Sequence, residues 1–279
     1  MDVVVIGAGP AGLQAGLTLG RMHRDVLVLD SGRYRNAPAE HMHNFATHDG
    51  RPPSEFRALA RADLTAYDTV EVRDLAATQV RRRAGGGFET TLADGTLVES
   101  AAVLLATGVR DVLPDLPGLA EAFGRVAHHC PFCHGHELAG RSVAVQDGPR
   151  AAHLVPMLRR ITHDVRVVSD PIDKIVVDGD DAVLTVAGQE VRVGGIFVAS
   201  ALEQAAPFAA QLGLDLLDSG CIAVDAMGRT SEPGVFAAGD LAHHRDLPMP
   251  LASVLNAAAA GQVAAGACVA DLLAAEAGH

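Results

Sequence analysis

The chain opens with Val3-Val4-Val5-Ile6, followed directly by Gly7-Ala8-Gly9-Pro10-Ala11-Gly12. The four apolar residues predict a buried strand, and the segment from Pro10 to about Met22 predicts a helix. A second apolar run, Val26 to Leu29, predicts another buried strand that ends at Asp30. Strand, glycine-rich turn, helix and strand in this order indicate a βαβ unit.

The glycines of this turn and the acidic residue after the second strand fit a dinucleotide site. Gly7 permits a tight turn, Gly9 lets a pyrophosphate approach the backbone, and Gly12 allows the helix to pack closely on the strand. Asp30 is placed to accept hydrogen bonds from a ribose diol. The alternative is an ordinary glycine turn in an α/β sheet, which seldom has an acidic residue at the end of the second strand.

Length and charge narrow the function classes. The 279 residues suggest two domains, or one domain split by an insertion. The net charge of −12 disfavours nucleic acid and anionic membranes as partners. We interpret Arg81-Arg82-Arg83, next to the turn Gly85-Gly86-Gly87, as a solvated hairpin end. The Ala-rich tail from Leu251 predicts a buried helix, and without an export signal we expect a cytoplasmic protein.

Further strand and turn signals lie downstream of this unit. Phe88 to Leu92, a turn at Asp94-Gly95, and Ala102 to Ala106 predict a meander that leads into Thr107-Gly108. Near the end, Gly234-Val235-Phe236-Ala237-Ala238-Gly239-Asp240 predicts a further buried strand that closes on a Gly-Asp pair. In this order the segments resemble the FAD-binding pattern of flavoprotein reductases that have two dinucleotide domains.

The resemblance implies FAD as the cofactor and assigns roles to particular residues. The carboxylate of Asp240 is expected near the ribityl and pyrophosphate region. Backbone amides near Ser253 and Val254, at the start of a helix from about Ala252, are expected at the pyrimidine end of the ring, where the helix dipole favours a reduced, anionic flavin. The expected cofactor-binding residues are Gly7, Gly9, Pro10, Ala11, Gly12, Asp30, Ser31, Arg35, Asn36, His43, Asn44, Ala77, Thr107, Gly108, Gly239, Asp240, Ser253 and Val254.

The same resemblance predicts the domain organisation. We expect an α/β fold with a three-layer Rossmann-type FAD domain, interrupted by a smaller domain of degenerate pyridine-nucleotide type. The FAD domain is predicted over residues 1–114 and 219–279, and the inserted domain over 115–218. The family also implies a homodimer.

A closely spaced cysteine pair carries the redox chemistry. Cys130 and Cys133 flank Pro131-Phe132 and are followed by His134. Two cysteines at this spacing can form a disulfide at a helix N-terminus, where the dipole lowers the pKa of a thiolate. The stretch resembles the active site of low-molecular-weight thioredoxin reductases. With Gly135-His136-Glu137 added it resembles still more the dithiol oxidases of bacterial and fungal disulfide natural-product pathways, because thioredoxin reductases carry Asp at the position of His134.

By this resemblance, Cys133 faces the flavin and Cys130 exchanges with the substrate. His134 is the candidate general acid and base, since an imidazole of ordinary pKa near 6.5 suits proton transfer with thiols, and His136 is a second candidate. Cys221 and Cys268 are expected to be buried hydrophobes.

Two other interpretations of the cysteine pair stay open. Cys-x-x-Cys-His is the attachment pattern of c-type haem, which normally requires export. Zinc could use the pair with nearby histidines, although the spacing is cramped and there is no second pair. We expect no metal. The ligating histidines of such a site would be His128, His129, His134 and His136.

A second nucleotide motif in the inserted segment is incomplete. After the strand Ser142 to Val145, the turn Gln146-Asp147-Gly148-Pro149-Arg150-Ala151 lacks the first glycine and places a carboxylate near a pyrophosphate. Ser169-Asp170 provides no cation for a 2′-phosphate, and the connection Pro171 to Gly194 is short. We predict weak NADPH binding. The alternative is that NADPH still binds although the motif is degenerate.

We therefore expect an FAD-dependent oxidase that converts a small dithiol to a disulfide, with dioxygen as the acceptor. The alternatives are a reductase of thioredoxin or a similar protein disulfide, fed by NADPH or another donor, and a flavin-binding redox sensor without turnover.

Overall fold

The computed structural model describes residues 1–169 and 171–278. Contacts divide the chain into two compact units. Unit 1 comprises residues 1–35, 54–110 and 202–279, and unit 2 comprises residues 36–53 and 111–201. Each unit is discontinuous in sequence. The expected domain limits of 1–114, 115–218 and 219–279 stay a prediction.

Unit 1 is built on a parallel five-stranded sheet. Its strands, in spatial order, are β18 (Val235–Ala237), β7 (Ala102–Leu105), β1 (Val3–Ile6), β2 (Val26–Leu29) and β3 (Val70–Arg73). All but β3 are apolar runs with every residue buried, as expected for parallel strands that are covered on both faces.

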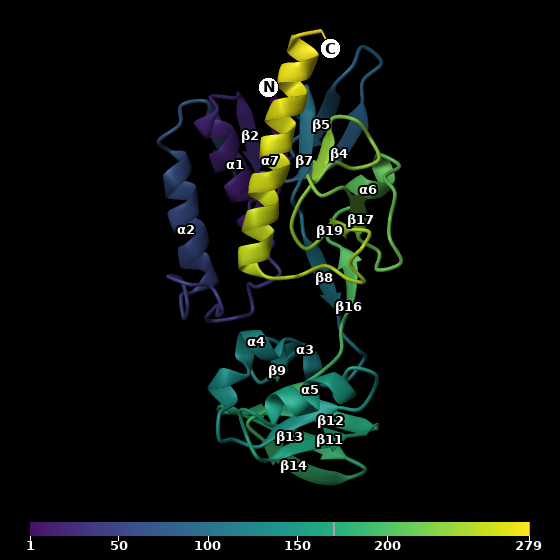
Figure 1. The fold of residues 1–279 in the computed structure, drawn as a ribbon. Coiled ribbons are helices and arrows are strands. Elements are labelled where there is room, and N and C mark those ends of the chain that lie inside the picture. Colours follow the sequence, from purple (N-terminus) through teal and green to yellow (C-terminus); the bar gives the residue numbers. More distant parts are fainter. Residues whose placement is uncertain (170, 279) are drawn as a thin grey trace. The chain divides into compact units, whose positions relative to one another are not determined.

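Helices cover one face of this sheet (Figure 1). They are α1 (Pro10–Arg21), α7 (Val254–Glu276) and α2 (Pro53–Leu64). Small residues allow α1 and α7 to approach closely, because a Cβ on Gly261 would lie 2.1 Å from the carbonyl oxygen of Ala11. By length and composition alone, α7 could also span a membrane. This is weak evidence for a membrane span, because the core helices of soluble proteins pass the same test. The helix packs on α1 through one face that carries its seven buried residues, so the buried helix predicted for this tail is buried on that face only.

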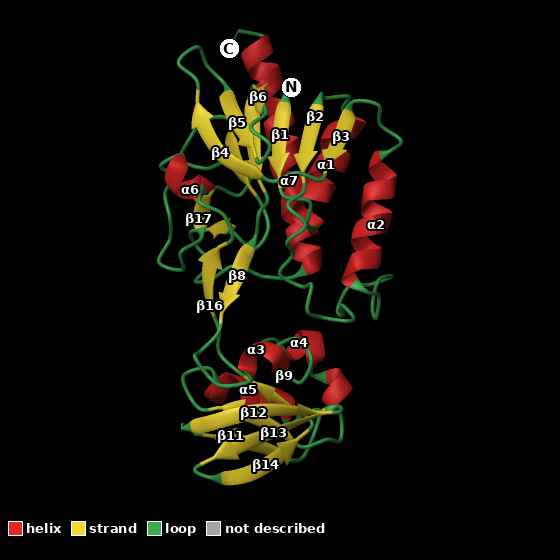
Figure 2. Ribbon diagram, turned by 180° about the vertical axis from the view of Figure 1, so that it is seen from behind, coloured by secondary structure: helices red, strands yellow, loops and turns green. Residues whose placement is uncertain are grey.

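Antiparallel strands cover the opposite face (Figure 2). Val80, Phe88 and Leu92 from these strands pack against the side chains of Val4 and Leu27. Helices, parallel sheet and antiparallel strands thus form three layers. The remaining elements of unit 1 are β4 (Ala77–Arg82), β5 (Phe88–Leu92), β6 (Leu97–Ser100), β8 (Val109–Val112), β16 (Ala201–Gln204), α6 (Phe208–Gln211), β17 (Ile222–Val224) and β19 (Ala242–His244), of which β8 and β16 run to the boundary of unit 2.

Unit 2 holds a four-stranded sheet and a three-stranded antiparallel sheet. The first has the order β11 (Val165–Val168), β10 (Val143–Gln146), β15 (Gly195–Phe197) and β9 (Ala127–His128), and the second has β12 (Ile172–Asp178), β13 (Asp181–Val186) and β14 (Gln189–Val193). The helical elements are α3 (Leu119–Ala122), α4 (Pro131–His134), the 3₁₀ helix η1 (His136–Leu138) and α5 (Ala151–Leu158). Helix α5 packs on β10 and β11 (Figure 2).

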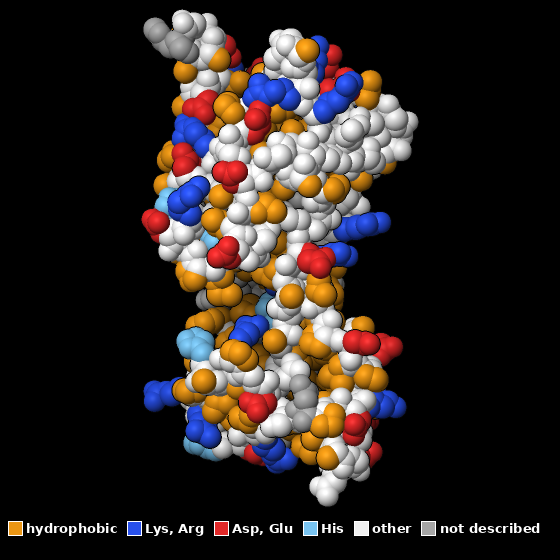
Figure 3. All heavy atoms as spheres, turned by 90° about the vertical axis from the view of Figure 1, so that its right-hand side faces the viewer, with side chains coloured by type: hydrophobic (Ala, Val, Ile, Leu, Met, Phe, Trp, Pro, Cys, Tyr) orange, Lys and Arg blue, Asp and Glu red, His pale blue; other side chains and the backbone are white. Residues whose placement is uncertain are grey.

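Charged side chains of both signs are interspersed on the face shown in Figure 3. The basic run at the end of β4 lies at the surface, as predicted. Arg81, Arg82 and Arg83 pair with Glu89, Glu232 and Glu99, respectively. Exposed pairs of this kind contribute little to stability, about 0–1 kcal/mol each.

Candidate functional site

The glycine-rich turn after β1 is shaped by backbone contacts. Gly7 has a φ of 113°, and a Cβ there would lie 2.3 Å from the carbonyl oxygen of Ala106. A Cβ on Gly12 would lie 1.7 Å from the carbonyl oxygen of Gly7. No side chain fits at either position, because the obstacles are backbone atoms that cannot move aside. The turn is therefore packed tightly between β1, β7 and α1.

Gly9 differs from its two neighbours. A Cβ on Gly9 would meet nothing within 4 Å, and its φ of −77° is open to any residue. Gly9 caps α1, a helix of 12 residues that begins with Pro10 and has no side-chain hydrogen bond at its N-terminus. The first amides of such a helix attract an anion. An open backbone with free amides at a helix N-terminus fits the pyrophosphate of a dinucleotide.

Asp30 lies at the end of β2 and is only 4% exposed. Its Oδ1 accepts a hydrogen bond from the Gly32 amide at 2.8 Å, and its Oδ2 accepts hydrogen bonds from the Tyr34 hydroxyl at 2.5 Å and from Arg61 at 2.6 Å. Burial and the hydrogen bond to Asp30 raise the pKa of Tyr34 to about 12. One lone pair of Oδ1 remains for a ribose hydroxyl, and that role stays a prediction.

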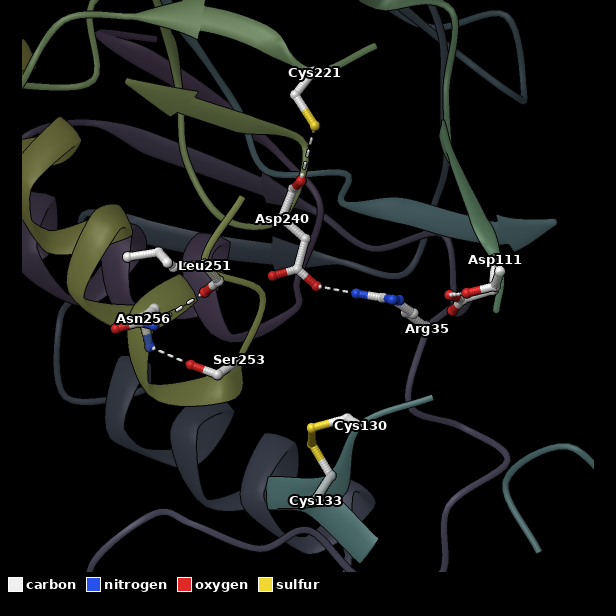
Figure 4. A network of polar contacts seen from close by, with 10 residues as sticks. Arg35, Asp111, Cys130, Cys133, Cys221, Asp240, Leu251, Ser253 and Asn256 are labelled. Carbon is white, nitrogen blue, oxygen red and sulfur yellow. Dashed lines mark hydrogen bonds and ion pairs between the residues drawn. A yellow bond between two sulfur atoms is a disulfide. The ribbon is translucent and has the colours of Figure 1, made fainter. Parts of the chain in front are cut away.

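Two expected cofactor residues from opposite ends of the chain meet in unit 1. Arg35 Nη1 donates to Asp240 Oδ2 at 3.0 Å, although the two residues are 205 positions apart (Figure 4). Gly239 adopts a φ of 90°, and a Cβ there would lie 3.0 Å from the Cβ of Ala11. The Gly-Asp pair is thus packed against the first turn of α1, where a dinucleotide would bind.

Helix α7 begins at Val254, close to the start near Ala252 that was predicted, and Ser253 caps its N-terminus. The Ser253 hydroxyl accepts a hydrogen bond from the Asn256 amide at 3.1 Å, and Val254 is the first helical residue. The Asn256 side chain donates to the carbonyl oxygen of Leu251 at 3.0 Å (Figure 4). These two bonds fix the path by which the chain enters the helix.

The remaining expected cofactor residues are divided between the units. Ser31, Ala77, Thr107 and Gly108 belong to unit 1, and Gly108 has a φ of 69°. Asn36, His43 and Asn44 belong to unit 2. Their roles toward the cofactor stay predictions.

Cys130 and Cys133 form a disulfide whose Cα atoms are 5.3 Å apart (Figure 4). Cys130 caps α4, which is a helix as expected but has only four residues. A single turn carries a small dipole, so its effect on a thiolate is weaker than a long helix would give. Cys221 and Cys268 are buried free thiols, as predicted. Burial raises the pKa of Cys268 to about 12, which keeps this thiol protonated and inert.

The His134 side chain is largely shielded from water, whereas the ordinary pKa of histidine applies to a solvated side chain. Its ring stacks on that of His128, with centroids 4.3 Å apart and planes 15° apart. Burial lowers the pKa of His134, with an opposing effect from Glu137 and a further lowering by His43. The pKa of His134 is thus lower than the ordinary value expected from the sequence, because a buried imidazole resists protonation, and its role in proton transfer stays a prediction. His136 begins η1 and is exposed.

His43 takes part in a charged network within unit 2. Its Nε2 lies 3.4 Å from Glu137 Oε1, and its Nδ1 lies 3.6 Å from Asp49 Oδ2. The amide of Asn44, which has a φ of 62°, donates to the same carboxylate at 2.7 Å. The segment from residue 36 to 53 is thereby joined to the helical elements that follow the cysteines.

The turn after β10 has a carboxylate at its centre. Asp147 Oδ1 accepts a hydrogen bond from the Gly148 amide at 2.8 Å, and its Oδ2 accepts one from the Ser169 hydroxyl at 3.0 Å. Arg150 donates to the carbonyl oxygen of His129 at 2.9 Å. Asp147, Gly148 and Arg150 line a cavity of about 150 Å³ together with Pro114, Gln146, Pro149, Leu154, Phe197, Val198 and Ala199. Asp170, the other acidic residue of the prediction, lies outside the described residues.

Among the described residues, no three His, Cys, Asp or Glu side chains are grouped so as to hold a metal ion. His128 and His134 stack face to face, whereas His129 stacks on Phe123 with ring centroids 5.7 Å apart. The histidines that the zinc interpretation requires thus point in different directions.

Several contributing residues were not anticipated from the sequence. Tyr34 and Arg61 hold the carboxylate of Asp30, and Asn256 braces the start of α7. His128 was considered only as a metal ligand. Its position at the end of a buried strand, two residues before Cys130, was the available signal.

Comparison with known proteins identifies the family. The family described as pyridine nucleotide-disulphide oxidoreductase matches residues 1–168 and 157–261. The chain belongs to the pyridine nucleotide-disulphide oxidoreductase family. The "Thioredoxin reductase sirT" of Leptosphaeria maculans is 33% identical over 96% of this chain and 93% of that protein. The "Thioredoxin reductase aclD" of Aspergillus oryzae is 44% identical, but the match covers 50% of this chain and 45% of that protein.

Solved structures of this family agree over the whole length. HlmI superposes with a TM-score of 0.89 at 32% identity, over 100% of this chain and 94% of that chain. The putative thioredoxin reductase TrxB of Bacillus anthracis also gives 0.89, at 27% identity and over 98% and 99% of the two chains. The predicted α/β fold and thioredoxin-reductase-like family are confirmed. The chain is a flavin-dependent disulfide oxidoreductase, and its cofactor is FAD.

Proposed function

We propose that this oxidoreductase oxidises a small dithiol to a disulfide through Cys130 and Cys133 and passes the electrons by way of FAD to dioxygen. The observation that carries the proposal is in the turn after β10, where the Asp147 carboxylate accepts a hydrogen bond from the Gly148 amide. In a pyridine-nucleotide site that position receives a phosphate. A protein that cannot take electrons readily from NADPH needs another donor, and a dithiol is one.

The resemblance of the cysteine motif to dithiol oxidases agrees with this direction of electron flow. The exposed ring of Phe132, which is 67% accessible, lies between the two cysteines and offers an apolar surface to a substrate. A small apolar dithiol therefore suits the site better than a highly charged one.

The Cys130–Cys133 disulfide is the direct oxidant of the dithiol in the proposed reaction. A substrate thiolate attacks Cys130, the Cys130–Cys133 bond breaks, and a mixed disulfide forms while Cys133 leaves as a thiolate. The second substrate thiol gives its proton to His134 and displaces Cys130, which releases the substrate disulfide. The reduced cysteine pair would then pass the two electrons from the substrate to bound FAD, whose chemistry would transfer them to dioxygen. One dithiol and one dioxygen give one disulfide and one hydrogen peroxide.

Anaerobic titration tests the proposal directly. The purified protein with FAD is mixed either with a dithiol such as dithiothreitol or with NADPH, and the flavin absorbance near 450 nm is followed. We expect the dithiol to bleach the flavin and micromolar NADPH to leave it oxidised, because a loss of roughly 4 kcal/mol converts a micromolar site to a millimolar one. In air, the dithiol should yield an equal amount of peroxide. Rapid bleaching by micromolar NADPH would overturn the proposal.

The roles of the two cysteines can be separated by spectroscopy. Cys130→Ser leaves the Cys133 thiolate as the donor to flavin and should show a long-wavelength charge-transfer band, whereas Cys133→Ser should not. Both variants should lose turnover. A band in Cys133→Ser alone would reverse the two roles and leave the overall chemistry intact.

Reduction of a protein disulfide is the second candidate. The family description and the similarity to the Bacillus anthracis protein favour it. It predicts that NADPH, and not a dithiol, reduces the flavin, and that oxidised thioredoxin is then turned over. A flavin-binding sensor without turnover is the outcome if neither donor reduces the flavin.

We also propose a cytoplasmic homodimer. The exposed surface of α7 carries Leu255, Val263 and Leu273, which are 41–51% exposed. Light scattering with Val263→Glu and Leu273→Glu variants tests whether this face joins two copies. A dimer that survives both changes would place the interface elsewhere.

A further inference from the structure

His128 is buried at the end of β9, immediately next to the stretch that carries the cysteines. It is 5% exposed, and its ring contacts two others. The His134 ring stacks on it with centroids 4.3 Å apart, and the Phe197 ring is tilted against it at 5.9 Å. His128 thus covers one face of the proposed general base and shields it from water.

Neither ring of the stacked pair can easily carry a proton at both nitrogens. The Nδ1 atoms of His128 and His134 are both buried and have no hydrogen-bond partner in the described part of the chain. An imidazolium has two N–H groups, and leaving one of them buried and unpaired disfavours the charged form. Two stacked imidazolium rings would also repel each other at this separation.

We propose that His128 is a positioning residue that keeps His134 in its neutral, proton-accepting form at pH values where a solvated imidazole would be protonated. The benefit is that the thiol chemistry can continue in mildly acidic conditions. The inference rests on the proposed role of His134 in accepting a thiol proton. The thiol–disulfide exchange at Cys130 and Cys133 does not itself involve His128, whose assigned function is to keep His134 neutral.

The charged and titratable groups around the pair are consistent with this role. Glu137 favours the protonated form of His134 and His43 opposes it, while burial has the largest effect and lowers its pKa. Burial, together with His134 and His129, lowers the pKa of His128 to about 3, so His128 itself stays uncharged. Glu137 is shared with His43 at 3.4 Å, which moderates its pull on His134.

An imidazole at position 128 has a different effect from a phenyl ring. The electron-rich face of a phenylalanine attracts a cation, so Phe at this position would stabilise a protonated His134. His128→Phe keeps an aromatic ring in the stack, although phenylalanine is somewhat larger. It should raise the pH below which the reaction slows, toward the ordinary imidazole pKa. His128→Ala should move it in the same direction, because water enters the space that the ring vacates.

The test is the pH dependence of anaerobic flavin reduction by dithiothreitol, in the FAD-loaded protein. Each variant rate is divided by the wild-type rate at the same pH, which cancels ionisation of the dithiol. His128→Phe should react at nearly the wild-type rate at pH 7.5 and up to about tenfold more slowly at pH 5.5, since an imidazole of ordinary pKa is then about nine-tenths protonated. His129→Phe is the matched control. Its ring stacks on Phe123 instead, and its ratio should not change with pH.

Histidine NMR titration of His134 provides a readout that is independent of turnover. The wild-type midpoint should lie below that of a solvated histidine, and His128→Phe should raise it. An unchanged midpoint and a pH-independent rate ratio in His128→Phe would overturn the proposal, even if the rate fell, because a structural role would lower the rate at every pH. Failure of the dithiol oxidase proposal would appear separately, as absence of peroxide in air.

Discussion

The two glycine-containing turns of this protein follow the same local plan and differ in chemistry. Both connect a buried parallel strand to a helix, β1 to α1 in unit 1 and β10 to α5 in unit 2. The first has an open backbone at Gly9 before a helix of 12 residues. The second has Asp147 bonded to its own turn, before a helix of eight residues that contains Pro156.

The difference shows that topology provides an edge of a sheet where a phosphate can bind, while a few residues decide whether it does. An anion-binding turn needs free amides and no competing negative charge. The turn of unit 1 meets both requirements, and the turn of unit 2 meets neither, because Asp147 supplies the anion itself. Predictions that alter one turn at a time test this contrast.

The largest effect is expected from Gly12→Val. Its Cβ would overlap the carbonyl oxygen of Gly7, so the helix must move away from the strand. We expect a loss of about 4 kcal/mol or more in the free energy of unfolding, measured by urea denaturation of the flavin-free protein. Gly266→Ala on α7 is the control. A Cβ there meets nothing within 4 Å, and the change should stabilise the protein by roughly 0.5–1 kcal/mol.

Gly9→Leu should separate cofactor binding from folding. The side chain projects into open space, so the free energy of unfolding of the flavin-free protein should change by less than about 1 kcal/mol. The same side chain blocks the approach of a pyrophosphate to the helix N-terminus, and the FAD affinity should fall at least about 100-fold, or roughly 2.7 kcal/mol. Fluorescence titration with FAD measures the affinity. A yellow variant with wild-type affinity would show that the pyrophosphate binds elsewhere.

One buried polar group from each unit offers a third contrast. Asp30 accepts hydrogen bonds from three donors, whereas Nδ1 of His128 has no hydrogen-bond partner among the described residues. Because burial lowers the pKa of His128 to about 3, the unfolded state binds a proton below pH 6.5 that the folded state does not, so stability falls as the pH falls. At pH 5.5 this term is about 1.4 kcal/mol. His128→Phe should remove it, so urea denaturation at pH 7.5 and 5.5 should give a smaller difference than in wild type.

The smallest effect is expected from repairing the second turn. The double variant Gln146→Gly with Asp147→Gly removes the competing charge and restores glycine at the turn. A charge at about 4 Å in a solvated site costs about 1 kcal/mol or somewhat more, so NADPH affinity should improve by roughly five- to tenfold. Isothermal titration calorimetry measures it. An improvement of a thousandfold would show that the turn alone excluded the nucleotide, and no change would assign the exclusion to the rest of unit 2.

Local sequence was sufficient for the parts of the protein that depend on local chemistry. The strands β1, β2, β7 and β18 were predictable because uninterrupted apolar runs are stable only where both faces are buried. The turn at Gly7 to Gly12 was predictable because its glycine spacing is that of a dinucleotide-binding turn, although the atom that excludes a side chain at Gly7 belongs to the distant Ala106. The cysteine pair was predictable because its spacing alone permits a disulfide.

Only the tertiary structure decided which distant side chains meet and which environment they share. Arg35 and Asp240 are paired where the loop after β18 packs against the first turn of α1, which no local pattern encodes. The stacking of His128 on His134 likewise depends on how β9 and α4 come together in unit 2. The pKa of His134 follows from that burial, since desolvation is set by every neighbour in space. Residue types can therefore be read along the chain, whereas their protonation depends on the folded surroundings.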